Sequence, residues 1–167
     1  MGTGVAHICQ SMADYLNQQE IPSQTAWPAA LRKEQEGPVV VVALQRCVVE
    51  PSGFQDYLGE RYDKESGQWV ECYGRKARLT LSLDIYAPEK CDGQTIQQTL
   101  DTLAGALLLG GPEGLNVEEF SCGQTDYDSS SRRLRRPAQA VFTAYLCAQT
   151  QSTGEFTDFV LRGVVNQ

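Results

Sequence analysis

The sequence is short of the side chains from which most catalytic and metal sites are built. His7 is the single histidine, and no two of the six cysteines form a CxxC pair. The sequence therefore lacks the usual spacing of zinc ligands. It also offers few residues that could act as the base beside a catalytic nucleophile. No GxxxxGK[ST] loop is present, and no GxGxxG follows a strand pattern. We therefore expect no enzymatic activity, no metal and no cofactor.

Long apolar runs and a leader pattern are also absent. The longest uninterrupted apolar run, at 39–44, is far shorter than a bilayer span requires. The first residues, "MGTGVAHICQSMADY", carry no basic segment followed by an apolar one. We therefore expect no membrane contact and a single domain over residues 1–167. Without an export signal, all six cysteines are expected to be free thiols.

Positive charge is scarce except in one place. The chain has 14 basic and 21 acidic residues, yet "RRLRR" places four arginines within five positions: Arg132, Arg133, Arg135 and Arg136. The rest of the chain is too acidic to be a general binder of phosphate backbones. Three interpretations stay open: a solvated loop, a contact patch for a second copy or a partner protein, and a nucleic-acid contact.

The chemistry of the arginines separates these interpretations in part. Guanidinium groups suit bidentate pairing with carboxylates at protein interfaces. Readers of single-stranded nucleic acid usually interleave aromatic with basic residues, whereas only Leu134 interrupts this cluster. Tyr127 and Asp128, just before it, belong to the same candidate interface. "DYDSSS" has too few oxygen ligands in series for a calcium loop, so we expect a polar connection that is mobile when unliganded.

Hydrophobic periodicity predicts the first elements. Val5, Ile8, Met12 and Leu16 recur at helical spacing, which predicts an amphipathic helix over 3–19. "GPVVVVALQRCVVEP" is rich in β-branched residues and predicts a strand over 39–49. Residues 52–76 are polar and rich in glycine, and "ESG" at 65–67 is typical of a hairpin tip. This segment is predicted to be a protruding hairpin arm.

The clearest pattern is "ARLTLSLDIYAP", in which apolar and polar residues alternate over ten positions. It predicts a strand with one buried face. A helix follows, with Asp92 as its N-cap and Gly110 after its end. Two sets of side chains are expected to pack on each other: Leu79, Leu81, Leu83 and Ile85 from the strand, and Ile96, Leu100, Leu103, Leu107 and Leu108 from the helix.

Three further strands complete the predicted order. "GLNVEEFSC" and "FTDFVLRGVV" fit short strands, and "AQAVFTAYLCAQT" alternates like the earlier strand. The predicted fold class is α+β, a mostly antiparallel sheet with two main helices packed on one face and a protruding hairpin arm.

The ordered pieces resemble a known family. "GPVVVVAL", "GRKARLTLSLDIYAPEKCDGQTIQQTLDTLAGALL" and "VEEFSCGQTDYDSSSRRLRRPAQAVFTAYLCA" are similar in pattern to the tail-completion or tail-terminator proteins of long-tailed bacteriophages and prophages. The best-matching stretch covers residues 76–148, and residues 52–74 and those after 150 depart from the pattern. None of the matching features is a catalytic signature.

The resemblance implies a structural role in the virion. Members of the family form rings, typically hexamers, on the head-proximal end of the tail tube, where they stop tube growth and meet the head connector. It implies tail tube, sheath and head connector proteins as partners, DNA passing through the channel without sequence-specific binding, and assembly in the host cytoplasm. The isolated chain is then either a ring or a monomer that assembles only on a tube end.

Alternative functions remain at this level. The arginine cluster at 132–136 is compatible with a nucleic-acid-binding module, which salt-dependent oligonucleotide binding would reveal. A head-completion or baseplate protein of the same kind of particle has the same general features. A small enzyme would require a cleft of clustered carboxylates in the folded protein.

Overall fold

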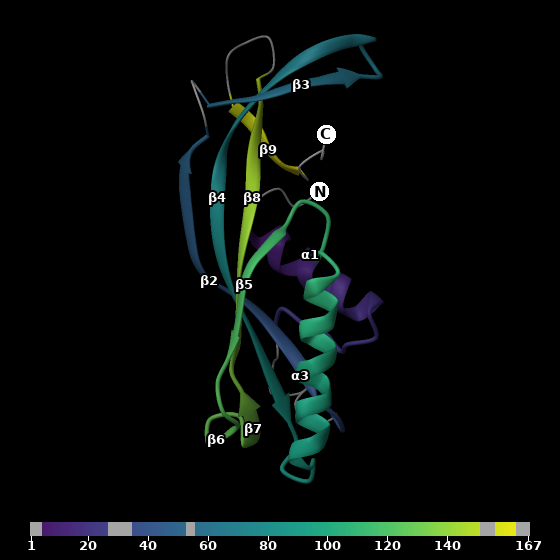
Figure 1. Cartoon of the computed structure of the whole chain (residues 1–167), viewed down its shortest axis with the longest axis vertical. Coiled ribbons are helices and arrows are strands. Elements are labelled where there is room, and N and C mark those ends of the chain that lie inside the picture. The colour runs from purple at the N-terminus through teal and green to yellow at the C-terminus, as the bar shows by residue number, and fades with distance from the viewer. Residues whose placement is uncertain (1–4, 27–34, 53–55, 151–155, 163–167) are drawn as a thin grey trace.

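The computed structural model describes residues 5–26, 35–52, 56–150 and 156–162. Within these ranges, nine strands form one sheet and two helices lie on one of its faces (Figure 1). The elements are α1 Val5–Gln18, β1 Ser23–Gln24, β2 Val39–Pro51, β3 Tyr57–Asp63, β4 Gln68–Ala87, α3 Gly93–Leu108, β5 Asn116–Cys122, β6 Asp126–Asp128, β7 Arg133–Arg136, β8 Ala138–Thr150 and β9 Phe156–Arg162. The α+β class is confirmed. The single domain over 1–167 stays a prediction.

Strand β4 is the centre of the sheet. It has 20 residues, so it reaches about 66 Å if fully extended. Strands β2 and β3 pair with one of its edges, and β8 and β7 pair with the other, all antiparallel. The parallel pairing in this sheet is that of the two-residue strand β1 with β2. The remaining strands, β5 and β9, pair with β8.

The predicted boundary between an arm over 52–76 and a separate core strand is wrong. Gly74 does not interrupt the strand. It is buried within β4 and lies opposite Cys147 of β8. Continuous pairing with β8 over 73–82 keeps the backbone extended through this glycine. One strand therefore runs from the arm into the core, so the arm continues the central strand of the body.

The core forms where the prediction placed it. Leu79, Leu81, Leu83 and Ile85 of β4 are fully buried, in one cluster with Ile96, Leu100, Leu103 and Leu107 of α3. Burying each such side chain stabilises the fold by about 1.5–3 kcal/mol. Leu108 was expected in the same stripe but is 87% exposed. It lies one residue, or about 100°, beyond Leu107 around the helix axis, which turns it away from the sheet.

Helix α1 packs beside α3 on the same face. Ile8, Met12 and Leu16 are buried, as the spacing predicted. The Tyr15 hydroxyl donates a hydrogen bond of 2.6 Å to the carbonyl of Ala106, which ties α1 to α3. The predicted helix over 3–19 corresponds to α1 at 5–18, and residues 3 and 4 lie outside the described residues.

Helix α3 has the predicted cap and stop. Asp92 Oδ1 accepts hydrogen bonds from the backbone N–H of Thr95 at 2.7 Å and from its hydroxyl at 2.6 Å. These bonds lower the pKa of the Asp92 carboxyl. After the helix, Gly110 and Gly111 adopt φ values of 116° and 70°, which side chains with a Cβ rarely adopt.

The hairpin arm is present and protrudes from the body. Strands β3 and β4 pair from Asp63 opposite Gln68 to Tyr57 opposite Tyr73. Gly67 closes the turn with φ 66° and donates its backbone N–H to the Asp63 carbonyl. In Figure 1 the arm forms the top of the molecule, beyond both helices.

The structure also bears on the expectations that the cysteines are free and that the protein makes no membrane contact. Five cysteines, those at 9, 47, 72, 91 and 122, are free, and the side chain of Cys147 lies outside the described residues. Neither described helix is long and apolar enough to cross a membrane.

Candidate functional site

The arginine cluster lies on an ordered hairpin. Strands β6 and β7 pair antiparallel, and β7 continues along the end of β4. Asp126 lies opposite Arg135, and Asp128 lies opposite Arg133, so opposite charges face each other across the strands. The segment that was predicted to be a polar connection therefore contains a two-stranded hairpin. The charges that suggested a solvated loop in the sequence instead lie on two paired strands that extend the sheet.

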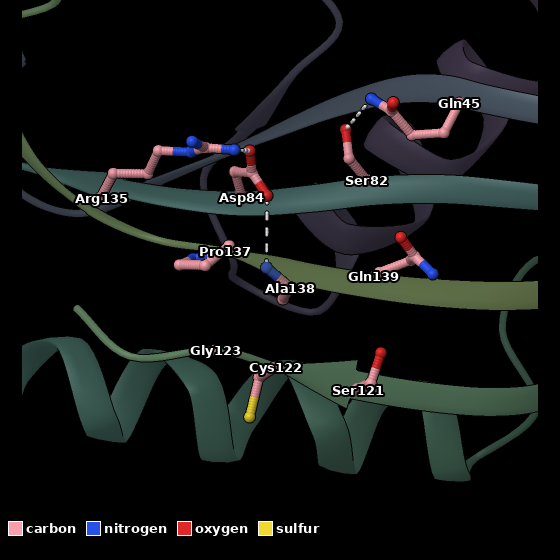
Figure 2. A pocket seen from close by; sticks show the side chains of 10 residues that line it. All are labelled: Gln45, Ser82, Asp84, Ser121, Cys122, Gly123, Arg135, Pro137, Ala138 and Gln139. Carbon is pink, nitrogen blue, oxygen red and sulfur yellow. Dashed lines mark hydrogen bonds and ion pairs between the residues drawn. The ribbon is translucent and has the colours of Figure 1, made fainter. Parts of the chain in front are cut away.

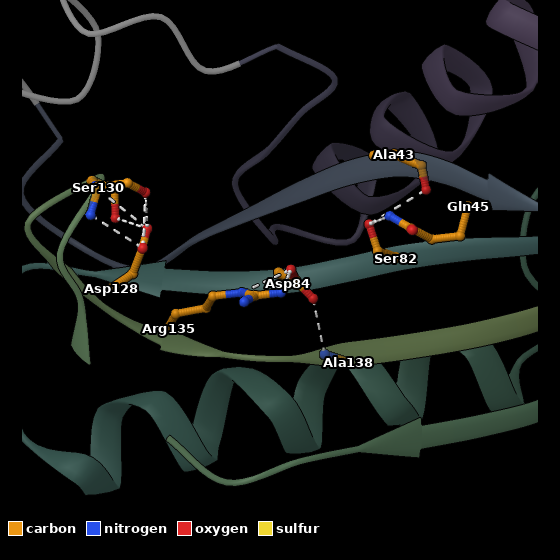
Figure 3. Close-up of polar contacts among 9 residues, drawn as sticks. Ala43, Gln45, Ser82, Asp84, Asp128, Ser130, Arg135 and Ala138 are labelled. Atoms are coloured by element: carbon orange, nitrogen blue, oxygen red, sulfur yellow. Dashed lines mark hydrogen bonds and ion pairs between the residues drawn. The ribbon is translucent and has the colours of Figure 1, made fainter. Parts of the chain in front are cut away.

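Asp128 shapes the turn of this hairpin. Its carboxylate accepts hydrogen bonds from the hydroxyl of Ser130 at 2.8 Å and from its backbone N–H (Figure 3). It also accepts hydrogen bonds from the hydroxyl of Ser131 at 2.5 Å and from its backbone N–H. These bonds lower the pKa of the Asp128 carboxyl. The carboxylate predicted as an interface group thus has a local role, which is to close the loop between β6 and β7.

Arg135 is held by Asp84 of β4. Its Nε and Nη2 donate to Asp84 Oδ2 at 3.0 and 2.7 Å, while Asp84 Oδ1 accepts the backbone N–H of Ala138 (Figure 3). The hydrogen bond to Asp84 is the main reason that the pKa of Arg135 is raised. The side chain of Asp84 is only 13% exposed. This ion pair joins the hairpin to the central strand.

Arg133 is the most buried of the four arginines. It is 8% exposed, and its Nη1 donates a hydrogen bond of 3.0 Å to the Gln35 carbonyl in the segment before β2. Arg133 is therefore a buried residue of the fold and not part of a solvated loop. Arg133 and Arg135 serve the fold, because β7 pairs with the end of β4 and so brings them to partners that are distant in the sequence.

Arg132 and Tyr127 both face solvent. Arg132 is exposed at the last position of the turn, with φ 54°, and it makes no ion pair with any described residue. Tyr127 is 52% exposed, and its hydrogen bond with Glu89 raises the pKa of its hydroxyl. Arg136 is half-buried, and its Nε has no hydrogen-bond partner among the described residues.

Substitution of single arginines should distinguish the exposed Arg132 from Arg133, which has a hydrogen-bond partner within the fold. Arg132→Asn should change the free energy of unfolding by less than about 0.5 kcal/mol, because Arg132 is exposed and Asn tolerates a left-handed backbone. Arg133→Ser should cost about 1–3 kcal/mol, because it leaves buried groups without their hydrogen bonds. Urea denaturation followed by circular dichroism measures both. Equal effects would contradict this division.

A pocket opens beside the Asp84–Arg135 pair, on the sheet face opposite the helices (Figure 2). Its volume is about 380 Å³, and uncharged amide and hydroxyl groups from Gln45, Ser82 and Gln139 contribute to its lining. The Asp84 carboxylate is already engaged by three donors. Among the described residues, no group of three or more His, Cys, Asp or Glu side chains could hold a metal ion.

The arm carries a second candidate surface, which we call the aromatic face. Residues that alternate along a strand share one face, so Trp69, Glu71 and Tyr73 of β4 lie together. Their partners on β3 are Tyr62, Glu60 and Tyr57. The Tyr62 and Trp69 rings meet edge to face at 5.7 Å, and those of Tyr57 and Tyr73 at 5.6 Å. Trp69 is 68% exposed.

Several solved protein chains are similar in structure to this one. The whole chain superposes on 65% of the length of the sheath/tube terminator of an extracellular contractile injection system, PVC, in its extended state, with 14% identity and a TM-score of 0.46. The match therefore spans just under two thirds of that protein. No family model matches the sequence, and no curated protein matches it. A likeness at this level assigns no role to any residue.

The aromatic face was missed by reasoning from the sequence, although a signal was present. Tyr57, Tyr62, Trp69 and Tyr73 stand in a segment otherwise rich in charge and glycine. Four large aromatic residues in a polar segment suggest a contact surface, because exposed aromatic side chains are enriched at protein interfaces. Their pairing across the arm could not be deduced, since it depends on the irregular register between Tyr57 and Gly59.

Proposed function

We propose that this protein is a structural component of a phage or phage-tail-like particle that caps the head-proximal end of the tail tube as a ring and joins the tail to the head connector. It acts by protein contact, without catalysis or a cofactor. Its partners are further copies of itself, the tube and sheath proteins and the connector, and it resides in the assembled particle after assembly in the host cytoplasm. The proposal extends the family resemblance of residues 76–148.

The observation that carries the proposal is the arm. Strand β4 leaves the helix-covered core and continues into a hairpin on which Tyr57, Tyr62, Trp69 and Tyr73 are all exposed. A two-stranded hairpin is marginally stable by itself, and clustered exposed aromatic rings mark contact surfaces. An arm of this kind suits a subunit that must grip neighbours in an assembly.

The alternative of a nucleic-acid-binding module has less support. Phosphate binding needs several cations free to contact the backbone, and Arg133 and Arg135 already hold a carbonyl and a carboxylate within the fold. Little salt-dependent binding to duplex or single-stranded oligonucleotides is therefore expected. A substantial salt dependence that Arg132→Asn abolishes would favour the alternative.

Deleting the gene in a host that produces the particle tests the proposed function. Without a terminator, tubes should grow to unregulated lengths and remain without heads, and electron microscopy measures both. Wild-type protein supplied in trans should restore defined lengths. Tails of normal length joined to heads in the deletion strain would refute the proposal.

A further inference from the structure

The aromatic face combines two features that are unfavourable in an isolated chain. Glu60 lies directly opposite Glu71 in the hairpin, and like charges in this position destabilise a sheet. Exposed aromatic pairs flank these glutamates on both sides along the strands. Tyr73 also donates its hydroxyl to Glu71 at 2.6 Å, which fixes that carboxylate on the face.

The chemistry of this face fits a guanidinium group. A cation placed between Glu60 and Glu71 removes the repulsion between the two carboxylates. It also lies within reach of the Tyr62–Trp69 and Tyr57–Tyr73 pairs, whose ring faces attract cations, arginine more often than lysine. The nearest cation along the same strand, Arg75, is engaged by Asp56 at 3.3 Å.

A suitable cation is displayed at the other end of the molecule. In Figure 1 the arm lies at the top and the β6–β7 hairpin at the bottom of the long axis. Residues 126–136 hold four arginines against two aspartates, and residues 57–73 hold four acidic residues against Arg61 and Lys64. The two ends therefore have opposite charge excess. Arg132 is exposed at the hairpin turn, and the ring of Tyr127 on β6 of the same hairpin is exposed as well.

We propose that the aromatic face of one copy binds the Arg132 turn of the next copy. The inference rests on the proposed ring and names the contact that builds it. Because the two surfaces differ and lie at opposite ends of the chain, the contact is heterologous, and its repetition produces a closed ring when the rotation between copies permits. Arg132 enters between Glu60 and Glu71, and Tyr127 packs at the margin of the aromatic rings.

Exchanging the charges tests the contact in the full-length protein. The variant Arg132→Glu places an acidic side chain opposite Glu60 and Glu71 in the proposed contact, and the variant Glu60→Arg with Glu71→Arg places basic side chains opposite Arg132. Each variant alone should associate more weakly than wild type, by on the order of a hundredfold in dissociation constant, because like charges then meet in every contact. Sedimentation velocity and native mass spectrometry over a concentration series measure this association.

A mixture of the two variants provides the decisive result. In equimolar mixture, each junction can pair an acidic surface with a basic one, so assembly should return, with the two variants in equal numbers. Arg46→Glu, at another exposed arginine on β2, makes the same charge change and should assemble like wild type. Circular dichroism should show that every variant is folded, since all the changed side chains are exposed.

Three results would overturn the inference: a wild-type chain that stays monomeric at every attainable concentration, an Arg132→Glu variant that associates like wild type, or variants that fail to assemble when mixed. The outcome is independent of the deletion experiment. Loss of length control together with a monomeric wild type would reject this contact and retain the proposed function. Normal tails after deletion, together with charge-dependent association, would reject the proposed function and retain this contact.

Discussion

Leu81→Asp is expected to leave the protein unfolded under conditions in which the wild type is folded. Leu81 is fully buried in the middle of β4, between Leu44 of β2 and Ala140 of β8. A carboxylate there has no cation or hydrogen-bond donor among its apolar neighbours. Burying an unpaired charge costs more free energy than the roughly 5–15 kcal/mol by which a typical domain is stable. Far-UV circular dichroism and the soluble yield measure the effect.

Two further variants keep this prediction testable if the aspartate variant cannot be purified. Leu81→Ala should remain folded but lose about 2–5 kcal/mol of unfolding free energy, because it opens a cavity in the core. Thr80→Asp, on the opposite face and across from Arg46, should fold like wild type. A loss below about 1 kcal/mol for Leu81→Ala would contradict the assigned burial.

Asp84→Ala is expected to have the second largest effect, a loss of about 2–3 kcal/mol of unfolding free energy. The substitution removes the partner of Arg135 and the acceptor of the buried Ala138 N–H. Breaking a fully buried pair costs about 3–5 kcal/mol, and we expect less here because the Arg135 side chain is 45% exposed and screened by solvent. Urea denaturation measures the change.

A double-mutant cycle isolates the ion pair from the other contacts of Asp84. The coupling energy between Asp84→Ala and Arg135→Ala should be about 1–3 kcal/mol, the range of directly contacting groups. Asp84→Asn should lose less than Asp84→Ala, because its amide oxygen can still accept the Ala138 N–H. A coupling energy near zero would mean that Asp84 does not anchor the hairpin in solution.

Because Arg135 stabilises the fold through Asp84, substitutions of Arg135 cannot test assembly separately from stability. Arg135 belongs to the cluster that the sequence marks as an interface, yet its partner is a residue of the central strand. Replacing all four arginines together would therefore disturb the fold as well as any interface. Arg132 is the position at which the contact can be tested while the hydrogen bonds of Arg133 and Arg135 remain intact.

Local periodicity was enough to determine the class and most elements of this fold. The alternation over residues 77–86 predicted the buried face of β4, and the helical stripe from Ile96 to Leu107 predicted the face of α3 that covers it. These predictions succeed because burial against a single core imposes the period of each element on its own sequence. Asp92 and Gly110 marked the ends of α3 because capping depends on residues close in sequence.

The roles of the charged residues were decided only by tertiary structure. Arg133 and Arg135 find partners at Gln35 and Asp84, which lie 98 and 51 positions away in the chain. The pairing of Glu60 with Glu71 depends on the register between β3 and β4. The local sequence of an arginine cluster does not show whether its members bind distant acceptors or face solvent. Strand order and register determine which acceptors lie near each arginine, and both depend on the packing of the whole sheet.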